Sequence, residues 1–200
     1  GMRQRVAIAR AFMLEHCTSF APHAGVLTNI TEDHLDRFGT MEAYAHMKGR
    51  IWDFQRVGDV AIANAADPWT MREAAGGVPG ELWTFDVRPG AQVIRGACMT
   101  ADRHAIELRL ASGVEHYPVD DLVIVGNHNL ENAMGAYLAA RSAGVPLEAI
   151  RAGARSYRPL PHRMERIGVL DVAGGDVHFY DDSKGTNDAS VAASVRGFPR

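Results

Sequence analysis

The 200-residue sequence has few cysteines, no long hydrophobic run and no concentration of basic residues. Its two cysteines, Cys17 and Cys98, are too few for a disulfide framework and lack the spacing of metal ligands, so we interpret both as packing residues. Because no run of about 18 apolar residues occurs and the first residues are not signal-like, the sequence predicts neither a membrane span nor secretion, and we expect a cytoplasmic protein. A net charge of −3 argues against nucleic acid as a partner.

The apolar content of 46% is enough for a hydrophobic core in one large domain or two small ones. Short β-rich segments alternate with amphipathic helices, a pattern typical of an α/β fold. Two further segments, 104–110 and 114–119, alternate polar and apolar residues and should pair antiparallel, so the predicted sheet is mixed but mostly parallel. The other expected strands are 25–30, 59–65, 82–87 and 122–126.

Three helices and a hairpin are expected between and after these strands. The helices are a Thr40-capped one to about Gln55, one from Asn129 to Gly144, and one over 147–156; the hairpin turns at Gly174 and Gly175, and a further helix is expected from Asn187. The segment RPLPHR, 158–163, contains two prolines and is the predicted domain boundary. We therefore expect an amino-terminal segment (1–13), a central domain (14–158) and the truncated start of a second domain (159–200).

Lys48 lies where the helix that follows Thr40 should bury an apolar residue. With Met41 as zero on a helical wheel, Tyr44 and Trp52 fall within about 80° and Lys48 within about 20°. Burial favours the neutral amine, which could form a Schiff base or take up carbon dioxide as a carbamate, an oxygen ligand suited to magnesium. The alternative is a lysine that packs its stem on the core and keeps its charge in water.

His34 follows the first expected strand within NITEDHLDR, where Glu32, Asp33 and Asp36 surround it. Imidazole is a common metal ligand, and neighbouring carboxylates can orient it or bind hydrated magnesium. A solvated acidic loop is the alternative interpretation. Fourteen residues separate His34 from Lys48, and this spacing could bring the two side chains together.

Asn129 and Asn132 are three residues apart in GNHNLEN and would share a helix face. Their amides could then hydrogen-bond the edge of a nucleotide base, although Asn129 could equally be an ordinary helix cap.

Polar residues near the carboxyl terminus form the last candidate site. Arg163 offers a two-pronged guanidinium suited to phosphate, and Asp182 ends a strand where its carboxylate could accept from ribose hydroxyls. Lys184 and Thr186 precede the helix expected from Asn187, whose amino terminus would favour an anion. A polar loop with a helix cap is the alternative.

Five of these segments occur together in the order and approximate spacing of the Mur ligases, which the chain resembles over about residues 14–200. They are NITEDHLDR, the lysine of MEAYAHMKGRI, GNHNLENA, LPHRME and DDSKGTN. The DSKGTN form is most similar to the members that add D-glutamate to UDP-N-acetylmuramoyl-L-alanine. The resemblance implies a monomeric, ATP-dependent ligase of peptidoglycan precursor synthesis, with a central ATP-binding domain and a Rossmann-like carboxyl-terminal domain.

The same resemblance implies a role for each candidate residue. ATP and Mg²⁺ would be the cofactors, D-glutamate and UDP-N-acetylmuramoyl-L-alanine the substrates. The implied roles are magnesium binding by His34 and carbamylated Lys48, adenine binding by Asn129 and Asn132, phosphate or ribose binding by Arg163, ribose binding by Asp182, and muramyl-substrate binding by Lys184 and Thr186.

The chain also departs from the family pattern. These 200 residues contain no G-T-N-G-K-[ST] phosphate loop, and Ile8 falls where the family has a magnesium-binding glutamate. Residues 1–12 instead resemble the signature segment of ABC transporter ATPases and are expected to form an amphipathic helix that packs through Val6, Ile8 and Phe12. We therefore expect a chimeric or truncated chain that is inactive alone. The alternatives are a non-catalytic nucleotide-binding or interaction module and a Schiff-base enzyme that uses Lys48.

Overall fold

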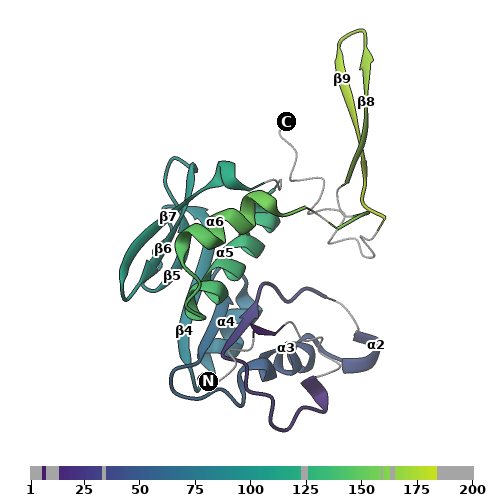
Figure 1. Cartoon of the computed structure of the whole chain (residues 1–200). Helices are drawn as coiled ribbons and strands as arrows, with labels where there is room; N and C mark the ends of the chain where they lie inside the picture. Colours follow the sequence, from purple (N-terminus) through teal and green to yellow (C-terminus); the bar gives the residue numbers. More distant parts are fainter. Residues whose placement is uncertain are drawn as a thin grey trace.

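The computed structural model describes residues 6–7, 14–32, 35–122, 126–158, 160–162 and 165–183. Within these residues the chain builds a seven-stranded sheet whose strands lie in the order of the sequence (Figure 1). The first five strands are parallel, and the last two extend the sheet by antiparallel pairing, so the predicted mixed, mostly parallel α/β fold is confirmed. The strands are β1 (Val6–Ala7), β2 (Ala24–Leu27), β3 (Val60–Asn64), β4 (Glu81–Pro89), β5 (Gly96–Met99), β6 (Ala105–Leu110) and β7 (Gly113–Pro118).

Helices cover both faces of this sheet (Figure 1). The helical elements are α2 (Leu35–Phe38), α3 (Met41–Gly49), the 3₁₀ turn η1 (Arg50–Trp52), α4 (Pro68–Ala75), the 3₁₀ turn η2 (Val119–Asp121), α5 (Asn127–Ser142) and α6 (Leu147–Ser156). Successive residues of β3 point to opposite faces: Ile62 packs in the core under α5 and α6, whereas Ala61 and Ala63 pack in the core under α3 and α4. Burial on both faces explains why β3 is apolar throughout its length.

The predicted start of α3 is confirmed, but its predicted end is wrong. The Thr40 side chain accepts a hydrogen bond from Ala43 N at 3.2 Å and caps the helix, with Glu42 in the first turn. The α-helix ends at Gly49 and tightens into η1, which turns Ile51 and Trp52 into the core. The Trp52 indole N–H donates to Gly25 O at 2.9 Å, a buried contact that fixes this turn against β2.

Several predicted elements differ from the structure. The strand expected over 25–30 ends at Leu27, because Asn64 and Asp67 take over hydrogen bonds beyond that point. Val6–Ala7 form a strand that pairs with β2, so the helix predicted there is wrong at these two residues. Leu122 and Gly126 lie in no strand. Segments 123–125 and 187–200 lie outside the described residues, and α4 and β5 were not predicted at all.

The predicted hairpin is confirmed as β8 (Glu165–Val172) and β9 (Gly175–Asp181), which form a separate two-stranded antiparallel sheet (Figure 1). Several of its apolar side chains are exposed, among them Ile167, Leu170 and Phe179. The domain division near residue 158 stays a prediction. In the part of the chain that the structure describes, no helix is long and apolar enough to cross a membrane.

Candidate functional site

Three segments meet at the carboxyl edge of the parallel strands. They are the residues after β2 (28–32), the turn after β3 (65–67) and the first turns of α5. Because β2, β3 and β4 run parallel, their carboxyl ends lie along one edge, which is where open α/β sheets bind ligands. Side-chain contacts join all three segments, and Asn64 makes most of them.

Asn64 is the last residue of β3 and is 3% exposed. Its amide nitrogen donates to Thr28 O at 2.9 Å, and its amide oxygen accepts from Ala66 N at 2.9 Å. A further side-chain hydrogen bond joins it to Glu131 on α5. Asn64 therefore satisfies backbone groups on both sides of the strand edge and ties α5 to them.

Asp67 performs two functions with its two carboxylate oxygens. Oδ1 accepts from Thr70 N at 2.8 Å and caps α4, while Oδ2 accepts from Ile30 N at 3.2 Å. The Ile30 side chain is buried, so the segment after β2 is held by both its backbone and its side chain. The β3–α4 turn thus fixes the segment that leads to His34.

Glu131 is half-buried beside these residues. Burial raises the pKa of its carboxyl above the ordinary value, the charges of Asp86 and Asp67 add to that rise, and the Asn64 hydrogen bond opposes it. Asp86 itself is buried, yet its pKa is lowered, because hydrogen bonds from Arg88 outweigh the effect of burial. The edge of the sheet is therefore an acidic environment in which one carboxyl resists ionisation.

Lys48 lies on α3 at the margin of the buried face. Its side chain is half-buried, and Nζ lies 5.3 Å from the centroid of the Tyr44 ring, which is itself buried. The helical-wheel prediction that Lys48 shares a face with Tyr44 is consistent with this contact. His34 lies outside the described residues, so the predicted meeting of His34 and Lys48 stays a prediction.

The two asparagines of α5 lie in its first turns, with Asn129 half-buried and Asn132 exposed. The alternative that Asn129 caps the helix is wrong, because α5 begins at Asn127 and Gly126 occupies the cap position with a φ of 93°. No side chain makes a cap hydrogen bond there; Gly126 O accepts from Asn129 N and Leu130 N instead.

Asp182 approaches the same end of α5. His128 is half-buried, and burial lowers the pKa of its imidazole while the charge of Asp182 opposes that shift. This electrostatic contact brings one predicted ribose-binding residue toward the helix that carries the predicted adenine-binding residues. Arg163, Lys184 and Thr186 lie outside the described residues, and their predicted roles stay predictions.

An exposed cluster of three residues lies next to Asp182. The ligand atoms of His162, Glu165 and Asp181 lie within 4.8 Å of one another. His162 Nδ1 is 2.7 Å from Asp181 Oδ2, and hydrogen bonds from His162 and then from Ser183 lower the pKa of Asp181 to about 2. These residue types bind divalent cations, but here the imidazole and the carboxylates already engage one another, so an ion pair explains the cluster.

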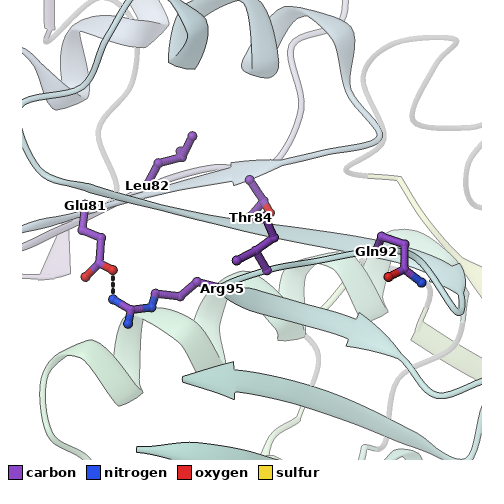
Figure 2. Close-up of a pocket in the computed structure, with 6 residues that line it drawn as sticks. Glu81, Leu82, Thr84, Gln92 and Arg95 are labelled. Atoms are coloured by element: carbon purple, nitrogen blue, oxygen red, sulfur yellow. Dashed lines mark ion pairs between the residues drawn. The ribbon is translucent and has the colours of Figure 1, made fainter. Parts of the chain in front are cut away.

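A cavity of about 590 Å³ lies on β4 and the segment before β5. Figure 2 shows residues that line it. Glu81 and Arg95 form an ion pair across it. None of the candidate residues lines this cavity, which therefore belongs to a different region from the carboxyl edge.

Sequence reasoning missed Asn64, Asp67, His128 and Glu131. The local signal for Asp67 is present, because an Asp followed by Pro68 is typical of a helix start. The contacts of Asn64 and Asp67 with the β2 segment span 36 and 37 positions, so no local pattern reveals them.

Residues 9–140 match the family profile described as the Mur ligase middle domain, and the chain therefore belongs to the Mur ligase family. The match begins inside the segment 1–13. The UDP-N-acetylmuramoylalanine–D-glutamate ligases of Desulfatibacillum aliphaticivorans and Acidobacterium capsulatum are each 37% identical to the chain, over 96% and 94% of its length. The chain spans 41% and 40% of the length of these two relatives.

Solved structures of the family share the fold. MurF from Acinetobacter baumannii superimposes with a TM-score of 0.64 at 23% identity, covering 86% of this chain and 36% of that one. MurF ligase from Thermotoga maritima in complex with ADP gives a TM-score of 0.58 at 19% identity, covering 90% of this chain and 40% of that one. These likenesses establish a Mur ligase fold for the described residues.

Proposed function

We propose that the protein joins D-glutamate to UDP-N-acetylmuramoyl-L-alanine at the expense of ATP, a step of peptidoglycan precursor synthesis. The observation that carries the proposal is the relationship to ligases of this name: 37% identity over 96% of the chain in one relative and 35% over 95% in another, from Cupriavidus metallidurans. The DSKGTN segment supports the same assignment. Because the chain spans about two fifths of these relatives, the proposal concerns the activity of the whole protein.

The proposed reaction has two steps. The alanyl carboxylate attacks the γ-phosphorus of ATP, which forms an acyl phosphate and releases ADP. The amine of D-glutamate then attacks the acyl carbon, the amide bond forms, and inorganic phosphate leaves with the electron pair of the broken C–O bond. Positioning and charge stabilisation supply most of the acceleration in phosphoryl transfer.

The nucleotide would lie along the carboxyl edge, against the first turns of α5. Asn129 and Asn132 would hydrogen-bond the adenine, Asp182 the ribose, and Arg163 the phosphates or ribose. The half-buried position of Asn129 in the first turn of α5 supports its part in this assignment. Lys184 and Thr186 would contact the muramyl substrate.

His34 and Lys48 would hold Mg²⁺. An amine is a poor ligand for this ion, which prefers oxygen, so the donor set fits magnesium only when Lys48 carries a carbamate. Lys48 is half-buried and its Nζ lies beside the Tyr44 ring, a contact that favours the charged ammonium, so carbamate formation would have to overcome this interaction. When bound, the ion would neutralise charge that develops on the phosphoryl oxygens. We also propose a monomer that acts in the cytoplasm, where its nucleotide substrates are made.

The proposal is tested by ADP release from the protein as its gene encodes it, with ATP, Mg²⁺ and UDP-N-acetylmuramoyl-L-alanine. Sustained release should require D-glutamate, with L-glutamate and D-alanine as matched controls. Equal release with all three amino acids would contradict the assigned specificity. Nucleotide binding by calorimetry without any turnover would favour the non-catalytic module instead.

A further inference from the structure

Two side chains of the β3–α4 turn hold the segment that leads to His34. Asn64 Nδ2 donates to Thr28 O at 2.9 Å, and Asp67 Oδ2 accepts from Ile30 N at 3.2 Å. Both backbone groups lie just beyond the end of β2 at Leu27, where the ladder to β3 has stopped. The side chains therefore replace the missing ladder bonds.

Neither contact is needed merely to form the local turn. Asp67 caps α4 with Oδ1 alone, and Asn64 closes its own turn with the amide oxygen, through Ala66 N. The second polar atom of each side chain is left to reach across to the neighbouring strand segment. A serine would cap α4 equally well but has one oxygen, so the acid at position 67 supplies a contact that capping does not require.

Asn64 also joins this segment to α5. Its side chain hydrogen-bonds Glu131, which lies between Asn129 and Asn132 along that helix. Asn64 is 3% exposed, so its polar atoms cannot exchange a lost partner for water. The loss of one of its hydrogen bonds should therefore also affect the others. Asn64 therefore interacts with both the segment 28–32 and the first turns of α5.

We infer that Asn64 and Asp67 are positioning residues that hold the segment 28–32, which leads along the chain to His34, in register with α5. This inference rests on the proposed function, because it assigns the two residues to the reaction of that same site. They touch no substrate; they act through the Thr28 and Ile30 backbone.

The primary test is Asp67→Ser, which keeps the α4 cap and removes the contact with Ile30. The matched control is Asp102→Ser, since the Asp102 carboxylate likewise accepts from a backbone N–H, that of His104, and from a threonine hydroxyl, but in a distant turn. Asn64→Ala is the second variant, with circular dichroism and thermal melting as the check on its fold.

Two measurements are made on each variant. Hydrogen exchange followed by mass spectrometry should show roughly tenfold faster exchange over 28–32 in Asp67→Ser, the scale of one lost hydrogen bond to a charged acceptor. The Mg²⁺ concentration for half-maximal, D-glutamate-dependent ADP release should rise about tenfold, while the KM for the UDP-linked substrate changes less than about twofold. A purely structural loss would reduce the active fraction and leave the magnesium dependence unchanged.

Unchanged exchange over 28–32 overturns the inference, as does faster exchange with an unaltered magnesium dependence. So does an equal effect in Asp102→Ser. A parent protein without D-glutamate-dependent turnover refutes the proposed function and this inference with it, whereas normal parent turnover with normal variants refutes the inference alone.

Discussion

Lys48 is half-buried, and its amine lies 5.3 Å from the centroid of the Tyr44 ring. The helical wheel placed Lys48 on the same face as Tyr44, in agreement with the structure. It could not predict how deeply the side chain is buried, because the residues that cover this face are distant in sequence. A cation over an aromatic ring gains about 0.5–1 kcal/mol at such sites. The contact orients the side chain without fixing its chemical state.

Lys48→Met should preserve much of the side-chain volume and lower the proposed ligase activity by about a hundredfold or more, because the carbamate ligand of Mg²⁺ is lost. Bicarbonate or acetate added to Lys48→Ala should restore part of the activity in steady-state ADP release, since a free carboxylate can take the place of the carbamate. Lys48→Arg, which keeps the positive charge and forms no carbamate, is the control. Full activity in Lys48→Arg would refute the carbamate.

Glu131 gives a pH-dependent prediction. Burial raises the pKa of its carboxyl in the folded protein, so the stability it contributes is fully present below the unfolded pKa of about 4.3 and is lost as the pH rises through the folded pKa. Glu131→Gln, which keeps an acceptor for Asn64, should therefore be more stable than the parent at pH 8. The difference should vanish at pH 4. Urea unfolding at several pH values measures both, and a difference that does not change with pH would contradict the burial of a carboxylate.

At the scale of single elements, sequence patterns succeeded where the decisive contacts are local. The Thr40 cap, the helix α6 and the alternation that produces β6 and β7 all depend on residues close in the chain. The short strand β5 was not predicted because it has only four residues, all of them small or polarisable, and its pairing with β4 decides its form.

Gly96 is the residue of β5 that cannot be replaced. Its φ is +141°, and a Cβ there would lie 1.7 Å from Thr84 O. We expect Gly96→Ala to cost about 3 kcal/mol or more in unfolding free energy, from strain and from the displacement of β4.

The control is Gly113→Ala, at the first residue of β7. Gly113 has a similar φ of +127° but no atom within 4 Å of its added Cβ, so its cost should be limited to backbone strain, about 1 kcal/mol. Chemical denaturation of both variants gives the comparison. Equal losses would mean that the close approach to Thr84 carries no energy.

At the scale of the whole molecule, the sequence predicted the fold class, which the sheet confirms. The five recognisable segments named Lys48, Asn129 and Asp182 as candidates, and their roles stay predictions; the charge of Asp182 acts on His128 of the α5 helix. The sequence could not predict the contacts of Asn64 and Asp67, because their partners lie in the segment that follows another strand. Side chains of this kind act through tertiary contacts, and such contacts leave no periodic pattern in the sequence.

Stability should be distributed unevenly over the described residues. All five residues of β3 are buried, whereas the hairpin of β8 and β9 exposes apolar side chains over most of its length. An isolated two-stranded hairpin is marginally stable in water, so amides of β8 and β9 in this 200-residue chain should exchange at least about a thousandfold faster than those of β3. Native-state hydrogen exchange tests this, and equal protection would show that other contacts cover the hairpin.

The strands of the seven-stranded sheet follow one another in space as they do along the chain. From β2 onward, each new strand adds to the open side of those already formed, and none has to be inserted between two paired neighbours. A ribosome delivers the chain in the same direction. The sheet can therefore form while the chain is being synthesised. A nascent chain arrested after β4 should already contain the paired strands β2, β3 and β4, to which the later strands add.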